Sequence, residues 1–236
     1  MTRPRIPSQN QWENHERRVL KVFARALELL RDGDEFDVPE DKLNRRLLSC
    51  VRSANYQLNE RGEGLESPVI YEANNQPDAD DEQRAKREDK RPDFQWGFID
   101  HSEEDPQRQD KFYVIECKRL GAPVRRSWVF NENYVGKGII RFVQAGYGYG
   151  KSAPSGAMVG YIRNTLAADI LSEVNRHATR AGLQKLVVTG DSKGEKDISR
   201  LDQRLDRPEV LPTPFLLRHL WVDLHKKGIG DPQSPD

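Results

Sequence analysis

The hydrophobic positions of the first sixty residues follow the spacing of two amphipathic helices. Between residues 12 and 31, apolar side chains recur every three or four positions, and mostly charged side chains fill the other face. A second stretch, from about Asp41 to Leu58, repeats this pattern and ends in the segment 59–64. Glu40 and Asp41 lie at the start of this second helix, where the helix dipole favours carboxylates. The pattern therefore predicts two helices before the first strand.

Short runs rich in aromatic and β-branched residues then predict three strands. The first run is 68–73, and the runs 92–100 and 111–119 flank an almost wholly polar segment. We expect the last two runs to pair as a hairpin and the first to lie beside it. Because side chains alternate along a strand, Glu116 and Lys118 should project from one face of the third strand.

The second half of the chain alternates between predicted helices and strands. Apolar spacing predicts helices at 134–144 and 166–181. Short apolar runs predict strands at 157–163, 185–189 and 214–224. The resulting order of helices and strands is typical of an α/β protein.

Three features between or within these elements need an interpretation of their own. Segment 76–91 carries charges of both signs and no bulky apolar residue, which predicts a mobile loop. Segment 146–152 ends in Gly-Lys-Ser as a P-loop does, but a predicted helix precedes it and Pro154 follows, so we interpret it as a turn. His219, on the last predicted strand, is interpreted as a packed, hydrogen-bonded histidine.

Composition limits the protein to a small set of classes. The chain has 236 residues, of which 36% are hydrophobic, enough for one substantial core. Its two cysteines, Cys50 and Cys117, lie in apolar segments and form no C-x-x-C pair, which argues against a disulfide framework or a zinc site. No apolar run reaches the ~20 residues of a membrane helix. We therefore expect a soluble, cytoplasmic protein without a membrane partner.

The strand that carries Glu116 and Lys118 holds the candidate chemistry. Burying both charges is costly unless they have partners or a metal, although a solvated ion pair that stabilises little is the simpler alternative. Asp93, at the start of the preceding strand, can supply a second carboxylate. Pro92-Asp93 followed by Glu116-Cys117-Lys118 resembles the motif of the PD-(D/E)XK nuclease superfamily.

This resemblance implies a site and a fold. Asp93 and Glu116 would hold Mg²⁺, or Mn²⁺ in its place, together with the backbone carbonyl of Cys117, and Lys118 would position or activate the attacking water. Superfamily members often add an acid from the helix before the sheet, which makes Glu40 a further candidate metal ligand. The implied fold is a restriction-endonuclease-like α/β core, αβββαβ, in which helices flank a mixed sheet, with a C-terminal helix and strands added.

The domain organisation follows from the same resemblance. Residues 1–40 are expected to form an N-terminal helical extension packed on the core. Residues 41–227 would form the nuclease-like domain, and residues 228–236, rich in Gly, Pro, Ser and Asp, a flexible tail.

A local excess of basic residues follows the motif, although the net charge of the chain is zero. From Lys118 to Lys151, seven basic residues stand against one acid, Glu132. Such a run beside a metal site suits phosphate binding, because each neutralised phosphate releases counterions; a solvated basic face is the alternative. The candidate nucleic-acid-binding residues are Arg119, Arg125, Arg126, Lys137, Arg141 and Gln144.

The predicted function is therefore a Mg²⁺-dependent endonuclease that acts on DNA, of the restriction or anti-phage defence type. One alternative is a catalytically silent or partner-dependent module of the same fold that binds nucleic acid or assembles with other proteins. An RNA-directed nuclease is another. DNA is the expected partner, through its phosphates. Association with partner defence proteins stays open, as does a homodimer, for which the apolar stripe of helix 12–31 is a candidate surface.

Overall fold

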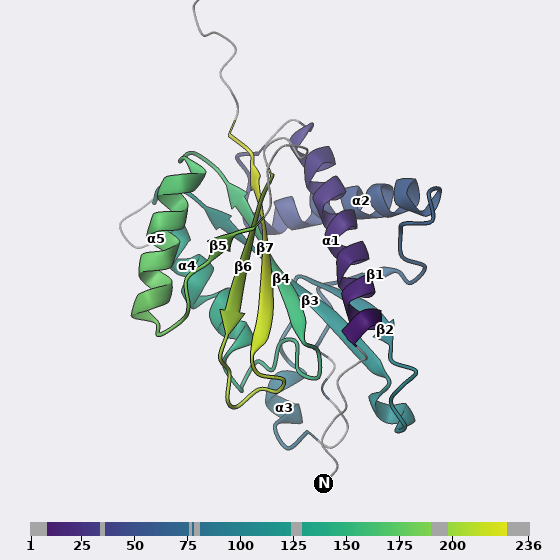
Figure 1. Ribbon diagram of the computed structural model, residues 1–236. Coiled ribbons are helices and arrows are strands. Elements are labelled where there is room, and N and C mark those ends of the chain that lie inside the picture. Colours follow the sequence, from purple (N-terminus) through teal and green to yellow (C-terminus); the bar gives the residue numbers. More distant parts are fainter. Residues whose placement is uncertain are drawn as a thin grey trace, which may run out of the picture.

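The computed structural model describes residues 9–33, 36–75, 77, 81–123, 129–189 and 198–225. Within them, seven strands form one mixed sheet with helices on both faces (Figure 1). The prediction of an α/β protein with a mixed sheet flanked by helices is thus confirmed. None of the helices in this part of the chain combines the length and apolar character needed to cross a membrane.

The elements follow the predicted order, with one strand and two short helices added. They are α1 (Gln9–Arg31), α2 (Glu40–Asn59), β1 (Val69–Tyr71), α3 (Arg84–Arg87), β2 (Phe94–Ile99), the 3-10 helix η1 (Pro106–Arg108), β3 (Asp110–Leu120), α4 (Phe130–Gly136), the 3-10 helix η2 (Ile139–Phe142), β4 (Ser155–Ile162), α5 (Ala167–Arg180), β5 (Val187–Val188), β6 (Ile198–Leu205) and β7 (Phe215–Asp223).

The strands lie side by side in the order β1-β2-β3-β4-β7-β6-β5. The central strands β3, β4 and β7 are parallel to one another. The pairs toward both edges are antiparallel, including the predicted β2–β3 hairpin. Pairing between β2 and β3 ends at Phe94 opposite Ile115, while β3 continues to Leu120 along β4. Among the described residues, one edge of the end of β3 is therefore free of a strand partner.

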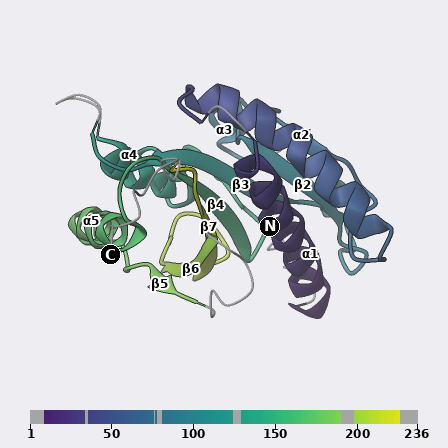
Figure 2. The same ribbon diagram turned by 90° about the horizontal axis from the view of Figure 1, so that it is seen from above.

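Two layers of helices cover the sheet, as Figure 2 shows: α1 and α2 on one face, α4 and α5 on the other. Ile115 and Cys117 pack in the α1–α2 layer and Val114 in the opposite layer, so the predicted alternation along β3 is confirmed. The apolar stripe of α1, including Phe23 and Leu27, is buried in the same core. That stripe is thus used inside the chain and is not the homodimer surface considered above.

Strand β6 was not predicted from the sequence. Its buried positions alternate, with Leu201, Gln203 and Leu205 facing the α4–α5 layer side of the sheet, while Arg200 and Arg204 project from the other face. The other strands were predicted from short apolar runs, and the charged residues of β6 leave it without such a run. A half-exposed antiparallel strand has this composition.

The helix predicted over 134–144 is instead divided into α4 and η2. The backbone leaves the helical conformation at Gly138, where φ is −117° and ψ is −82°. A Cβ atom at Gly138 would lie 2.5 Å from Cε of Met158 and 2.4 Å from the Tyr134 carbonyl oxygen. The absence of a side chain at Gly138 therefore allows this segment to approach strand β4 closely, and the helix is interrupted at the same position. Gln144 lies beyond the end of η2.

The described part of segment 76–91 contradicts the prediction of a mobile loop. It contains α3 and is attached to the glycine-rich segment 146–152, which forms the predicted turns. Asp81 accepts hydrogen bonds from the guanidinium of Arg87 and from Nζ of Lys151 at 2.8 Å. Arg87, which is buried, also donates to the carbonyl of Ala145 at 2.7 Å. Buried ion pairs therefore order a segment that lacks apolar side chains.

His219 is a packed histidine, as predicted. Its Nδ1 lies 2.8 Å from the hydroxyl of Tyr134, which accepts a hydrogen bond from the indole of Trp221 at 2.9 Å. Its Nε2 is buried without a hydrogen-bond partner. Burial lowers the pKa of His219 to about 3. The ring is therefore neutral in the folded protein near neutral pH.

We predict that His219 contributes to unfolding in acid. Because its folded pKa of about 3 lies below the ordinary value of 6.5, the stability that depends on the neutral ring is complete above pH 6.5 and is lost as the pH falls toward 3. The free energy of unfolding should fall by roughly 3 kcal/mol more between pH 7 and pH 4 in the parent than in His219→Gln. Urea unfolding across this pH range measures the difference, and parallel curves would contradict it.

Candidate functional site

Asp93 lies immediately before β2, next to the free edge of β3. Its Oδ2 accepts a hydrogen bond from the backbone N–H of Cys117 at 2.6 Å, and its Oδ1 accepts one from Nδ2 of Asn44 at 3.0 Å. Burial and the nearby charge of Glu116 raise the pKa of Asp93 well above its usual range. The hairpin thus brings the aspartate to the Glu-x-Lys strand, as the sequence predicted.

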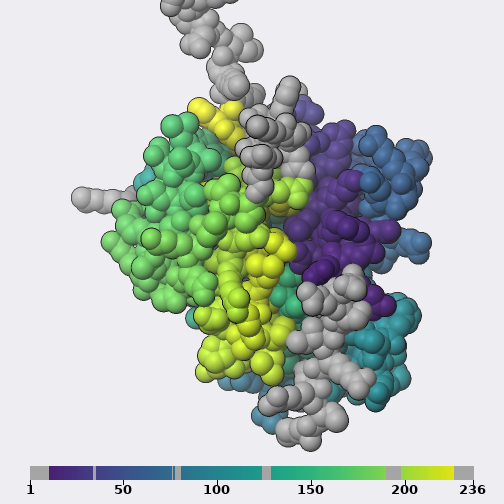
Figure 3. Space-filling model, viewed as in Figure 1, coloured from purple at the N-terminus to yellow at the C-terminus, as the bar shows by residue number. Residues whose placement is uncertain are grey.

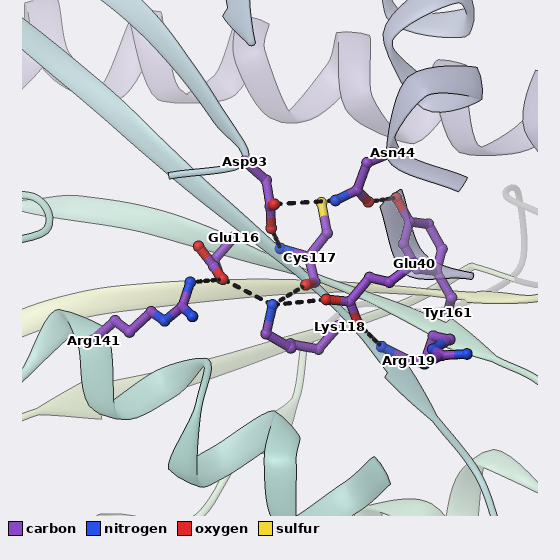
Figure 4. Close-up of polar contacts among 9 residues, drawn as sticks. All are labelled: Glu40, Asn44, Asp93, Glu116, Cys117, Lys118, Arg119, Arg141 and Tyr161. Atoms are coloured by element: carbon purple, nitrogen blue, oxygen red, sulfur yellow. Dashed lines mark hydrogen bonds and ion pairs between the residues drawn. The ribbon is translucent and has the colours of Figure 1, made fainter. Parts of the chain in front are cut away.

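Glu116 is fully buried on β3. Its Oε1 accepts a hydrogen bond from Nζ of Lys118 at 2.8 Å and another from the guanidinium of Arg141. Its Oε2 is buried and has no hydrogen-bond partner among the residues that the structure describes. Burial raises the pKa of Glu116, although Lys118 and Arg141 both oppose this shift. Both side-chain cations therefore contact Oε1 of this carboxylate, and among the described residues neither contacts Oε2 (Figure 4).

The ammonium of Lys118 lies among three oxygen atoms that come from two elements. Nζ donates to the carbonyl of Cys117 at 2.7 Å, to Oε1 of Glu116 at 2.8 Å and to Oε1 of Glu40 at 2.9 Å (Figure 4). Burial alone would lower the pKa of Lys118, but the surrounding carboxylates raise it above its ordinary value. This arrangement rules out the solvated ion pair, because Glu116 is buried and Lys118 is 9% exposed.

Glu40 joins the cluster from the first turn of α2. Besides its bond to Lys118, its Oε2 accepts the backbone N–H of Arg119 at 3.1 Å. Glu40 therefore does more than complement the helix dipole, since it ties α2 to the end of β3. Its contact with the predicted site residues is established, whereas its role as a metal ligand stays a prediction.

Asn44 and Tyr161 belong to the site and were missed from the sequence. Asn44 is buried on α2 and connects two groups: it donates to Asp93, and its Oδ1 accepts from the hydroxyl of Tyr161 at 2.8 Å. The sequence signal that could have identified Asn44 is its position, as a polar residue next to Leu43 on the apolar stripe of a predicted helix. These bonds fix the orientation of the Asp93 carboxylate.

We predict that Asn44→Ala lowers the free energy of unfolding by roughly 2 kcal/mol, because two buried polar groups lose their partner. Urea unfolding at neutral pH measures the loss. Asn14→Ala, at an exposed position of α1, is the matched control and should change stability by about 0.5 kcal/mol or less. Equal stabilities of the two variants would show that Asn44 does not anchor Asp93.

Arg141 reaches the cluster from η2, on the α4 side of the sheet. Its guanidinium pairs with Glu116 and also lies over the ring of Tyr147, 5.5 Å from the ring centroid. The ammonium of Lys90 lies 5.4 Å from the centroid of the same ring. Tyr147, which the sequence did not single out, therefore contacts two cations beside the acidic cluster.

The other predicted nucleic-acid-binding residues are placed less centrally. The guanidinium of Arg119 packs over the ring of Phe130 at 4.7 Å, and Lys137 and Gln144 are exposed. Because Gln144 lies beyond η2, it does not share a helix face with Arg141 as expected. Arg125 and Arg126 lie outside the described residues.

A second polar cluster lies in a cavity of about 660 Å³ lined mainly by α1, β6 and β7. Figure 3 shows α1 beside β6 and β7 on this face. Three of its charged side chains pair with one another: Arg218 donates to Glu16 at 2.7 Å and also pairs with Asp202. None of the predicted site residues that the structure describes lines this cavity. The cluster around Glu116 is therefore the better candidate for chemistry.

Among the described residues, no group of three or more His, Cys, Asp or Glu side chains is arranged to hold a metal ion. Most of the oxygen atoms predicted as ligands instead contact N–H groups or the Lys118 ammonium; Glu116 Oε2 has neither among the described residues. Both cysteines are free thiols, in line with the expectation of no disulfide. The chain matches no protein-family model, no curated protein and no solved structure.

Proposed function

We propose that this protein is a divalent-metal-dependent nuclease that hydrolyses phosphodiester bonds in DNA. The observation that carries the proposal is the convergence of Asp93, Glu116 and Lys118 at the free edge of β3, with Glu40 and Arg141 in contact with them. Burying this many charges is a costly way to stabilise a fold. Its cost favours a chemical role for the cluster.

The arrangement of the surrounding elements is consistent with a restriction-endonuclease-like core, which is part of the proposal. Helix α2 precedes the antiparallel strands β1, β2 and β3, and α4 then leads to β4, which is parallel to β3. This is the αβββαβ order that the sequence resemblance implies. Strands β5, β6 and β7 and helix α5 would be additions to that core.

Two observations support a Mg²⁺ site at this cluster. The donors of Asp93, Glu116, the Cys117 carbonyl and Glu40 are all oxygen atoms, the ligands that Mg²⁺ prefers. Glu116 Oε2 is a buried acceptor without a hydrogen-bond partner among the described residues, and burial is the main cause that raises the pKa of Asp93 and of Glu116, so that a bound cation would offset the cost of burying their charges. These residues therefore fit a divalent cation by charge and by ligand type.

The side chains divide the chemistry among them. Asp93 and Glu116, with the Cys117 carbonyl, would hold the cation, which supplies Lewis-acid stabilisation of phosphate charge and a more acidic water. Lys118 would exchange one of its three present contacts for a hydrogen bond to the attacking water and would stabilise the charge that develops on the phosphate. Asn44 keeps Asp93 oriented. Arg141, whose guanidinium pairs with Glu116, would contact a phosphate of the substrate.

The test is cleavage of supercoiled plasmid DNA by the purified protein. Nicked or linear product should form with Mg²⁺ or Mn²⁺ and not with EDTA, and Asp93→Asn and Glu116→Gln should each lose at least about 100-fold in rate. Single-stranded DNA and an RNA of equal length define the substrate, since cleavage of RNA alone would replace DNA in the proposal. Absence of cleavage together with absence of metal binding would favour the non-catalytic binding module.

A further inference from the structure

The two cations at Glu116 are held in different ways. Lys118 has two other acceptors, the carbonyl of Cys117 and the carboxylate of Glu40, and its side chain is 11% exposed. The side chain of Arg141 is 26% exposed, and its Nε is buried without a hydrogen-bond partner. Arg141 also comes from the short η2 helix, whereas Lys118 comes from the central strand β3. Lys118 is fixed in the cluster, and Arg141 is the cation that can leave it.

A place outside the cluster exists for the guanidinium of Arg141. The partly exposed ring of Tyr147 lies beneath it, so the side chain can move away from Glu116 and keep this contact. A divalent ion at Glu116 would meet both side-chain cations on the same carboxylate, and their mutual repulsion is strong in a buried site. The more weakly held cation is then the one displaced.

We propose that Arg141 is a displaceable counter-cation of Glu116. It neutralises the buried carboxylate while no metal is bound, it competes with the metal for that carboxylate, and its release by the metal makes the guanidinium available to a substrate phosphate. This inference rests on the proposed function, since it concerns the same metal and the same substrate. It couples metal binding to the assembly of the phosphate-binding group.

A purely structural role for Arg141 makes the opposite prediction. If the guanidinium served to hold Glu116 in a metal-binding orientation, its removal would weaken metal binding. If it competes with the metal, its removal strengthens metal binding. The sign of the change in affinity therefore distinguishes the two roles.

The experiment is calorimetric titration with Mn²⁺ alone on the full chain. Arg141→Gln retains a long polar side chain beside Tyr147, and it should bind Mn²⁺ about fivefold or more tightly than the parent, at the low end of typical coupling between sites. Arg141→Met is a second neutral variant, and Arg141→Lys, which keeps the charge, should stay closer to the parent. Arg176→Gln, at an exposed position of α5, controls for the loss of one positive charge and should leave the affinity unchanged. Weaker or equal binding by both neutral variants would overturn the inference.

Two further measurements separate this inference from the proposed function. If Glu116→Gln binds Mn²⁺ as the parent does, the metal does not bind at Glu116, and both the proposed function and the inference fail. If Glu116→Gln loses binding and neither neutral Arg141 variant gains it, the proposed function stands and the inference alone fails. At saturating Mn²⁺, single-turnover DNA cleavage by Arg141→Gln should be about 100-fold slower than by the parent. Tighter metal binding with an unchanged rate would overturn the assignment of Arg141 to the phosphate.

Discussion

Lys118→Ala is expected to slow single-turnover DNA cleavage at saturating Mg²⁺ by about 1,000-fold, the loss typical of removing one preorganised group that stabilises transition-state charge. The ammonium is held by three oxygen atoms at 2.7 to 2.9 Å, so its position is set before substrate binds. Lys118→Arg should not restore the rate, because a planar guanidinium cannot reproduce these three short contacts. Single-turnover kinetics with excess protein measure the effect directly.

The control for this variant is Lys185→Ala, at an exposed position after α5. It removes the same charge away from the cluster and should cleave at the parent rate. A Lys118→Ala protein that is folded and cleaves as fast as Lys185→Ala would remove Lys118 from the mechanism. Circular dichroism of each variant establishes that the comparison is between folded proteins.

The largest expected effect on stability comes from Arg207. This side chain is fully buried, and its guanidinium carbon lies 3.6 Å from the centroid of the Phe215 ring. Burial lowers the pKa of Arg207 to about 9. Its guanidinium donates hydrogen bonds to the backbone carbonyls of Phe142, Tyr149, Gly150, Ala153 and Pro212. It thereby connects η2, the glycine-rich turn and the segment between β6 and β7.

Arg207→Met should lower the free energy of unfolding by about 5 kcal/mol, because five buried carbonyls lose their donor at about 1 kcal/mol or more each. This loss is comparable to the whole stability of many domains. Arg204→Met, at an exposed position of the preceding strand β6, should cost about 0.5 kcal/mol or less. Urea unfolding of the two variants beside the parent gives both values. A difference below about 1 kcal/mol between them would mean that water or a rearranged backbone replaces the guanidinium.

The parts of the site that could be predicted depend on short-range geometry. The alternation of side chains along one strand was enough to place Glu116 and Lys118 on one face of β3. The hairpin was enough to bring Asp93 to the backbone of Cys117. Both relations follow from the pairing of neighbouring strands, which the pattern of apolar residues makes visible in the sequence.

The parts that were missed depend on partners far apart in the sequence. In the sequence, nothing distinguishes Asp81 from the other charged residues around it. In the fold, its ion pair with Lys151 helps to order the segment that was predicted as a loop. No local pattern in the sequence links Asn44 to Tyr161, although Tyr161 donates a hydrogen bond to Asn44 and Asn44 donates one to Asp93. Arg207 stands in a polar stretch, and only the fold surrounds it with carbonyl groups. Burial of a polar residue is decided by tertiary packing, which local periodicity does not report.

The proposed mechanism requires one divalent cation bound by the carboxylates of Asp93 and Glu116. A crystal structure of the protein soaked in Mn²⁺, with the ion identified by its anomalous scattering, shows whether such a site exists. One Mn²⁺ should be bound by both carboxylates and by the carbonyl of Cys117, with the guanidinium of Arg141 moved away from Glu116. If Glu116 is still paired with Lys118 and Arg141, and no Mn²⁺ lies beside it at saturating concentration, the proposed metal site is wrong.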